Sequence, residues 1–353
     1  MSSIVSTYSL GAASLSAMAQ TQNQLSVLTV ESSSGEYADL GIQLGDQSGY
    51  ELSLRSQADR MQTLTTANNL TVTNLTTAQA AIDSIRTTAE SAVSTLTSLS
   101  AGSSGAATTL QNTGTNALQS LIADTNTTAN GQYVFGGENS GVAPMTDYFS
   151  SATSTAKSAI DTAFQSTFGF APTSASASTI SASDMQTFLS GTFADLFSGT
   201  NWSGDPSSLW SSASSTDVTT QIAPGESATT STDANQPGFQ QLTEGYAMLA
   251  EFGGSSLSSA AQQTVITAAT SLINQGIASL TTTEATLGAA QTQVTNANSS
   301  MSNQLTILQT QIGNLDNVDS QKIATQLNSL QTQLQTAYQL TAQLQKMNLA
   351  QYL

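Results

Sequence analysis

Two long stretches of the chain carry apolar residues at the spacing of an α-helix. In the first, seven-residue steps and a second row three positions later define a heptad repeat, formed by Leu54, Met61, Asn68, Leu75, Ile82, Ala89 and Leu96 with Leu64, Ala78, Ile85, Ala92 and Leu99. Seven residues make two helical turns, so both rows lie on one face, which predicts one helix about 70 Å long packed against a partner. Asn68 in this repeat is either a tolerated polar residue or a hydrogen-bonding residue that fixes the register, and the sequence leaves both interpretations open.

The second stretch repeats the pattern near the other end of the chain, at Leu280, Leu287, Val294, Met301, Leu308 and Leu315. The pattern is interrupted over 313–319 and resumes from Ile323, so two helices in line or one bent helix would satisfy it. After the first stretch, a Gly/Ser-rich break at 100–106 ends the helix, and a shorter helix is expected around Leu110, Leu118, Leu121 and Ile122. We predict a helical core of ten residues: Leu54, Met61, Leu75, Ile82, Leu96, Leu280, Leu287, Val294, Met301 and Leu308.

The middle of the chain has a different composition. All five prolines, both tryptophans and all ten phenylalanines lie between Phe135 and Phe252. Proline breaks helices and large aromatic residues favour compact packing, so the pattern predicts an inserted domain between two helical ends. We expect helical parts at 1–130 and 241–353 and an inserted α+β or β-rich domain at 131–240. The predicted fold is mainly α, a long antiparallel helical bundle formed by both chain ends with the smaller domain inserted.

The two chain ends carry apolar stripes that neither end can bury alone. The N-terminal stripe could face the stripe at 323–347, and a helix with one apolar face needs such a partner to be stable. We expect these stripes to form an assembly interface, made by Ile4, Tyr8, Leu15, Met18, Leu25, Leu327, Leu330, Leu334, Leu344 and Met347.

The outer face of the C-terminal helices is polar but almost uncharged. From 281 to 353 the charged residues are Glu284, Asp316, Asp319, Lys322 and Lys346, against dozens of Gln, Thr, Asn and Ser. A helix that stays in solvent usually carries more Glu and Lys, whereas a face covered by copies of itself avoids the cost of burying charge. The pattern favours packing against neighbouring subunits. A general bias of this sequence toward Thr, Ser and Gln is the alternative explanation.

Composition narrows the possible chemistry. The formal net charge is −17 with only six Lys and Arg, so nucleic-acid and anionic-membrane binding are disfavoured. Without Cys or His, the chain lacks thiol and imidazole catalysts and most zinc ligands, and we expect no catalytic, cofactor or metal site. The carboxylate pairs Glu36/Asp39 and Asp316/Asp319 are interpreted as solvated loop residues. The first residues do not resemble a cleaved signal peptide, and no segment is apolar enough to span a membrane.

Four segments resemble the hook-associated protein 3 family of the flagellin superfamily, in its alphaproteobacterial form. They are the segment Val30–Met61, the G-x-Y-x-F-x-G turn in "GQYVFGGENSGVAPM" (131–145), the stretch Leu209–Leu242 and the ending "NLAQYL". Only 146–205 contains no recognisable anchor. The acidic residues at 316–319 are sparser here than is usual in flagellin-type proteins, which leaves the contacts of that region open.

The resemblance implies a structural, non-enzymatic role as a junction adaptor between the flagellar hook and filament. It also implies partners: hook-associated protein 1, flagellin, copies of the chain in a ring, and an export chaperone. Export would occur without a cleaved signal peptide, to the extracellular flagellum. Two alternatives stay open, a flagellin-type filament subunit and an enzyme displayed on such a scaffold.

Overall fold

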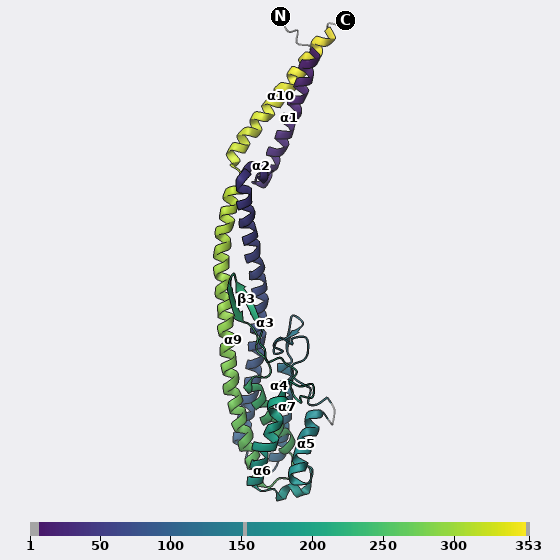
Figure 1. Ribbon diagram of the computed structural model, residues 1–353, viewed down its shortest axis with the longest axis vertical. Helices are drawn as coiled ribbons and strands as arrows, with labels where there is room; N and C mark the ends of the chain where they lie inside the picture. Colours follow the sequence, from purple (N-terminus) through teal and green to yellow (C-terminus); the bar gives the residue numbers. More distant parts are fainter. Residues whose placement is uncertain (1–6, 151–153, 351–353) are drawn as a thin grey trace. The chain divides into compact units, whose positions relative to one another are not determined.

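A computed structural model describes the backbone of residues 7–150 and 154–350 and the side chains of 11–150 and 154–343. Most of the described chain is helical (Figure 1). The helices are α1 (Thr7–Ser34), α2 (Leu40–Leu44), α3 (Ser48–Ser98), α4 (Ala106–Thr125), α5 (Thr155–Phe168), α6 (Ala182–Phe188), α7 (Gly199–Trp202), α8 (Pro237–Phe252), α9 (Ser259–Asp316) and α10 (Ser320–Ala350). Short helical turns lie at η1 (Gly45–Gln47), η2 (Ala175–Thr179), η3 (Leu189–Phe193) and η4 (Ala194–Phe197), and four short strands at β1 (Thr128–Ala129), β2 (Gln132–Tyr133), β3 (Thr219–Ala223) and β4 (Glu226–Thr229). The predicted mainly-α fold is confirmed.

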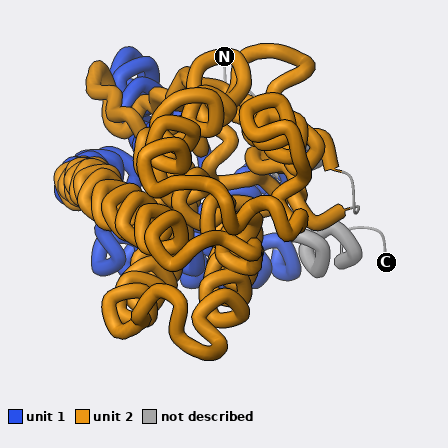
Figure 2. The backbone as a smooth tube through the Cα atoms, turned by 90° about the horizontal axis from the view of Figure 1, so that it is seen from below, with its two compact units in different colours: residues 1–62, 302–353 blue, residues 63–301 orange. Residues whose placement is uncertain are grey.

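The chain divides into two compact units (Figure 2). Unit 1 comprises residues 1–62 and 302–353, and unit 2 comprises residues 63–301. The boundaries fall inside the long helices α3 and α9, so this division differs from the one expected at 131 and 240. The expected insert, 131–240, lies wholly within unit 2.

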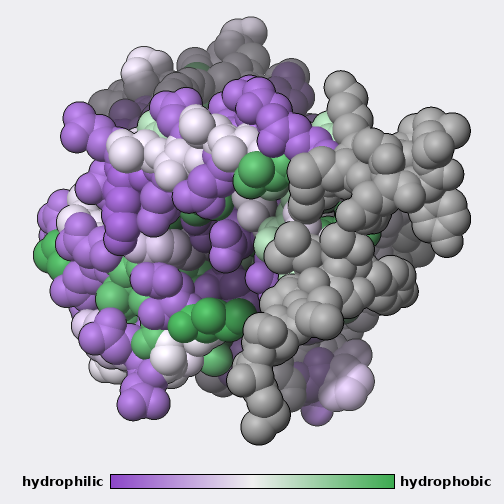
Figure 3. All heavy atoms as spheres, turned by 90° about the horizontal axis from the view of Figure 1, so that it is seen from above, coloured by the Kyte–Doolittle hydropathy of each residue, from purple (hydrophilic) through white to green (hydrophobic). Residues whose placement is uncertain are grey.

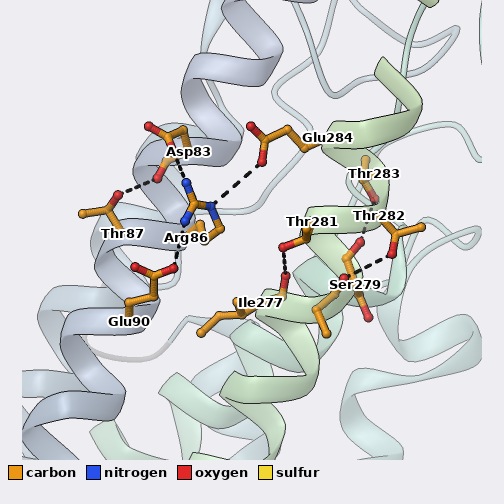
Figure 4. A network of polar contacts seen from close by, with 11 residues as sticks. Asp83, Arg86, Thr87, Glu90, Ile277, Ser279, Thr281, Thr282, Thr283 and Glu284 are labelled. Atoms are coloured by element: carbon orange, nitrogen blue, oxygen red, sulfur yellow. Dashed lines mark hydrogen bonds and ion pairs between the residues drawn. The ribbon is translucent and has the colours of Figure 1, made fainter. Parts of the chain in front are cut away.

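In unit 2, α3 and α9 run antiparallel, as the two heptad repeats predicted. Asn68 pairs with Asn298 at 2.8 Å and Gln291 donates to Thr76 at 3.0 Å, so positions that rise along α3 fall along α9. Farther along, Arg86 of α3 pairs with Asp83 and Glu90 of its own helix and approaches Glu284 of α9 at 3.9 Å (Figure 4). The side chains buried between the helices are mostly apolar, with Asn68 as a polar exception, and the ion-paired side chains are partly exposed.

The predicted helical-core residues are mostly buried in the single chain. Met61 is half-buried and the other nine are buried, namely Leu54, Leu75, Ile82, Leu96, Leu280, Leu287, Val294, Met301 and Leu308. The shorter helix expected after the Gly/Ser break is α4, and its four predicted apolar residues are all buried. The interruption at 313–319 separates two helices, because α9 ends at Asp316 and α10 begins at Ser320.

Helices α4 and α8 pack closely against each other within unit 2. Gly114 of α4 makes this approach possible, since a Cβ at that position would lie 2.4 Å from the backbone nitrogen of Ala250. Helix α8 buries most of its length, including Phe239, Leu242 and Tyr246. The aromatic residues of the middle region pack against this α4–α8 pair.

The middle region is built from short helices, loops and two small hairpins around an aromatic core. Phe164 contacts the rings of Phe188 and Phe252 at 5.5 and 5.4 Å between centroids. Trp202 and Trp210, two of the large aromatic residues that predicted a compact insert, are both buried, and their rings stack at 6.3 Å. The strands pair only as β1–β2 and β3–β4 in the described chain, so β structure is a minor part of this region.

Glu251 joins the middle region to α8. Its Oε1 accepts a hydrogen bond from the hydroxyl of Tyr148 at 2.7 Å and pairs with Nζ of Lys157, on α5, at 2.6 Å. Burial, with the charge of Glu251 as the next cause, raises the pKa of Tyr148 well above its usual range, so this tyrosine donates to the carboxylate. The contact ties α5 to the helical scaffold.

The G-x-Y-x-F-x-G turn connects α4 to the middle region. Asn130 and Gly131 join β1 to β2 with positive φ angles of 54° and 80°, as a tight hairpin turn requires. Phe135 is fully buried and meets Phe239 edge to face at 5.2 Å. Gly137 has φ 58°, and a Cβ there would lie 2.3 Å from the carbonyl oxygen of Ser214. The local structure therefore explains the residues of the motif: Phe135 is a buried anchor, and the glycines on either side of it form two tight turns.

In unit 1, α1 and α10 lie side by side (Figure 1). Ser14 and Thr341 share a hydrogen bond of 3.1 Å, and Gln22 donates to the hydroxyl of Tyr338 at 2.8 Å, so the helices are antiparallel. The two helices that carry the terminal stripes therefore pack against each other, with Met18 of the N-terminal stripe buried and Leu15 of the same stripe exposed.

Candidate assembly interface

Exposed apolar side chains concentrate on unit 1. Of the twelve large hydrophobic side chains exposed in the described chain, nine belong to this smaller unit: Leu15, Val27, Val30, Ile42, Tyr50, Leu52, Ile307, Tyr338 and Leu340. Figure 3 shows hydrophobic residues in green interrupting the hydrophilic surface seen from above. Scattered exposed apolar residues are ordinary, but their enrichment on one unit is typical of a surface that partners cover.

Unit 1 buries little apolar surface of its own. Its buried hydrophobic residues among those described are Met18, Leu54, Leu305, Leu308 and Ile323, and all five lie outside the large core cluster, which is formed in unit 2. Of the described side chains of α1, only Met18 and Glu31 are buried. Helical stability comes mostly from packing an apolar face, so α1 and α10 gain little from the single chain.

The predicted interface residues do not share one environment. Leu15 is 60% exposed and Met18 is buried, while Leu25, Leu327, Leu330 and Leu334 are half-buried. Ile4 lies outside the described residues, as do the side chains of Tyr8, Leu344 and Met347. Met18 and the half-buried leucines already have partial cover within the chain, which leaves Leu15 as the one described member that is largely open to partners.

Sequence reasoning missed several exposed apolar residues of the terminal helices. Val27 and Val30 of α1 and Tyr338 and Leu340 of α10 are each about half exposed. These four residues do not lie on the apolar stripes that helical spacing identifies. A search for apolar residues out of register with those stripes would have found them.

Threonine gives the uncharged face a specific surface chemistry. Along α9 and α10, Thr306, Thr325 and Thr336 each donate the side-chain hydroxyl to the backbone carbonyl four residues earlier, at 3.1, 2.8 and 2.9 Å. A threonine bonded in this way has satisfied its donor inside its own helix, and its methyl group remains for contact. Such a face can be covered by a neighbour without leaving those donors unpaired.

A shallow groove of about 510 Å³ follows the contact between α1 and α10. Its apolar lining comes from Val27, Leu28 and Leu330, and its polar lining from Asn23, Gln24, Glu31, Gln326 and Ser329. Aliphatic side chains flanked by polar groups are the combination found in protein interfaces, which have an apolar core and a polar rim.

Between these helices and the ends of α3 and α9, a set of polar contacts forms a joint within unit 1. The Arg55 guanidinium pairs with both Glu51 and Asp316. Hydrogen bonding to Glu51, supported by Asp316, raises the pKa of Arg55. The backbone nitrogen of Tyr37 donates to the Asp316 carbonyl at 3.0 Å, and that of Val318 donates to the Gly35 carbonyl at 2.9 Å.

The joint corrects one sequence interpretation. Asp316 was expected to be a solvated loop carboxylate, but it is 1% exposed and ion-paired with Arg55, 261 residues away in sequence. The other carboxylates of the two pairs are exposed. Asp39 caps α2 by accepting from the nitrogen of Ile42, and Asp319 caps α10 by accepting from the nitrogens of Gln321 and Lys322.

The described residues contain no helix long and apolar enough to cross a bilayer. They also contain no cluster of three or more acidic, His or Cys side chains suited to a metal ion.

Two family models match the chain, one at each end. The bacterial flagellin N-terminal helical region matches residues 5–140, and the bacterial flagellin C-terminal helical region matches residues 270–353. A search of curated proteins gave no match. The matched regions together take in more than half of the chain, and they contain the paired helices α1 and α10 and the long helix α3. The chain therefore belongs to the flagellin superfamily, whose members are structural components of the bacterial flagellum.

Proposed function

We propose that this chain is the junction adaptor between the flagellar hook and the filament, the role of hook-associated protein 3. The observation that carries the proposal is the stretch Leu209–Leu242, which resembles that family. In the structure this stretch contains the stacked Trp210 and the β3–β4 hairpin, whose Ile222 carbonyl accepts from Asn68 of α3 at 2.7 Å. The resembling segment is thus tied directly to the long helices. The ending "QYL" supports the same assignment.

Assembly would proceed by burial of the terminal helices. The exposed apolar residues of unit 1 and its small core mean that ordering α1 and α10 gains little in the single chain. Fixing the backbone costs about 1–2 kcal/mol per residue, which packing against neighbours would offset. The proposal includes a ring of copies, hook-associated protein 1 on one side and flagellin on the other. Export as an unfolded chain, held by a chaperone and without a cleaved signal peptide, fits the same energetics.

The second candidate is a filament subunit. It is favoured by the two family models, because both describe flagellin itself. The two roles differ in stoichiometry, since a filament contains many more subunits than a ring at its base.

A deletion strain tests the proposal. Cells lacking the chain should build hooks, release flagellin into the medium and carry no filaments, and complementation should restore the filaments. The amount of the chain in purified flagella should be a small fraction of the flagellin present. If the chain is instead the main protein of the filament, the filament role is correct and the junction role is wrong.

A further inference from the structure

A pocket of about 490 Å³ opens at the joint of unit 1. Three of the residues around it are acidic, Glu36, Asp59 and Asp316, and one is basic, Arg55. Apart from these four, the lining is uncharged: Ala58, Gln309, Ile312, Gly313 and Asn317. The charged groups at the pocket therefore leave an excess of negative charge.

One buried carboxylate oxygen in this pocket lacks a partner. Asp316 is 1% exposed, and its Oδ2 pairs with Arg55, but its Oδ1 accepts no hydrogen bond from any described residue. A buried acceptor left unpaired costs on the order of 1–3 kcal/mol, more when it is charged. Beyond its contribution to the acidic lining, Asp316 thus offers an unpaired buried oxygen, which points to a missing donor.

A metal ion is a poor candidate for the missing partner, because the described residues contain no group of three or more His, Cys, Asp or Glu that could hold one. A guanidinium or ammonium group fits better, since it supplies several N–H donors and one positive charge to carboxylates. The chain has six cationic residues in all. Arg55, Arg86 and Lys157 are already ion-paired, and the side chain of Lys346 is not described.

The two remaining cations, Arg60 and Lys322, are exposed and belong to unit 1. Neither has an ion pair among the described residues. Lys322 lies in the first turn of α10, where the helix dipole disfavours a positive charge, so local helix electrostatics do not account for it. The chain thus presents an acidic pocket and unpaired cations on one unit, which is the complementarity that contact between copies requires.

We propose that the joint pocket receives the cationic side chain of a second copy of this chain, supplied by Arg60 or Lys322. The ion pair would fix the register of neighbouring subunits, while apolar burial supplies most of the association free energy. This inference rests on the proposed function in one respect, that copies of the chain lie side by side in the flagellum.

Cross-linking between differently tagged copies tests the proposal, and the natural absence of cysteine makes it specific. One copy carries Glu36→Cys and the other carries Arg60→Cys or Lys322→Cys, and both are expressed in the same cells. Isolated flagella are treated with a short bis-maleimide, because an ion pair holds its Cα atoms farther apart than a disulfide spans. A heterodimer containing both tags is expected for one of the two pairings.

Two controls make the result decisive. Thr306→Cys, an exposed position on α9, replaces the cationic partner and should give little heterodimer. Gln309→Cys, an uncharged lining residue, replaces Glu36→Cys in case loss of that carboxylate prevents incorporation. If the tagged copies are present in flagella and neither pairing exceeds the Thr306 control, the inference is wrong and the proposed function stands. A cross-link to a different protein would also overturn it. If the unsubstituted chain is absent from flagella, the proposed function itself fails.

Discussion

At the scale of single residues, Asn68 shows how one polar side chain joins three elements. It is fully buried on α3, and its Nδ2 donates to the Ile222 carbonyl of β3 at 2.7 Å and to Asn298 of α9 at 2.8 Å. The heptad pattern identified the position as unusual but could not supply its partners. The hairpin and α9 lie 154 and 230 residues away in sequence, and only the folded chain brings them together.

We expect Asn68→Ala to lower the free energy of unfolding by about 1–3 kcal/mol, because the Ile222 carbonyl would be left buried without a donor. Gln57→Ala, an exposed change on the same helix, should shift it by no more than about 0.5 kcal/mol. Urea denaturation followed by circular dichroism measures both. Equal effects would mean that Asn68 is a tolerated polar residue, not a structural link.

Glu244 predicts a pH dependence of stability. Burial raises its pKa from 4.5 to about 7 in the folded chain. The folded state then holds this proton more tightly than the unfolded state, so its contribution to stability is complete below pH 4.5 and is lost as the pH rises toward 7. Glu244→Gln removes the titration. As the pH rises from about 4.5 to 8, the free energy of unfolding of the variant should therefore increase relative to that of the parent chain by up to ~3 kcal/mol.

The measurement is a series of urea denaturations across that pH range, with Glu138→Gln as the matched change at an exposed glutamate. Other carboxylates with raised pKa, such as Asp124 and Asp233, titrate in both chains and cancel in the difference. A stability difference between Glu244→Gln and the parent that does not change with pH would contradict the prediction.

At the scale of elements, the sequence predicted the long helices and their antiparallel pairing better than it predicted the middle region. Heptad spacing identified α3 and α9 because few structures other than a long packed helix produce a heptad repeat of this length. The contents of the middle region were less predictable. Its aromatic residues indicated a compact core, but they pack between short helices more than on sheets, as Phe164 and Phe188 show. Aromatic burial serves either architecture, and the choice depends on contacts distant in sequence.

The α4–α8 pair offers a test with a matched control. Gly114→Ala places a methyl group 2.4 Å from the Ala250 nitrogen, so the helices must separate, at a cost of about 1–3 kcal/mol. At Gly288, in the interior of α9, the nearest atom to an added Cβ is 3.9 Å away. Gly288→Ala should therefore stabilise the chain by about 0.5–1 kcal/mol through helix propensity. Thermal melts of the two variants should move in opposite directions.

At the scale of the whole molecule, apolar residues are distributed unevenly between the units. Unit 2 contains the large core cluster, whereas unit 1 contains most of the exposed large hydrophobic side chains. The sequence indicated a partner-covered surface through its uncharged helices. It could not separate the leucines that α1 and α10 shield for each other, such as Leu330, from those that face outward, such as Leu15, because heptad spacing assigns both kinds to the apolar stripes. Nor could it foresee the ion pair between Arg55 and Asp316, which depends on the fold.

This distribution implies that the exposed apolar residues of unit 1 contribute to assembly but little to the stability of the isolated chain. A double substitution tests this. Leu15 and Leu340 are 60% and 54% exposed, so Leu15→Asp with Leu340→Asp should change the melting of the isolated chain very little. The same change should prevent incorporation into flagella if neighbours cover these side chains, because each carboxylate would be buried without a partner at a cost of several kcal/mol.

Leu54→Asp is the contrasting control, since Leu54 is 4% exposed and the substitution should destabilise the isolated chain. Circular dichroism of the purified proteins and immunoblots of isolated flagella measure the two effects. Normal incorporation of the double variant would mean that these residues stay exposed in the flagellum and that assembly uses another surface.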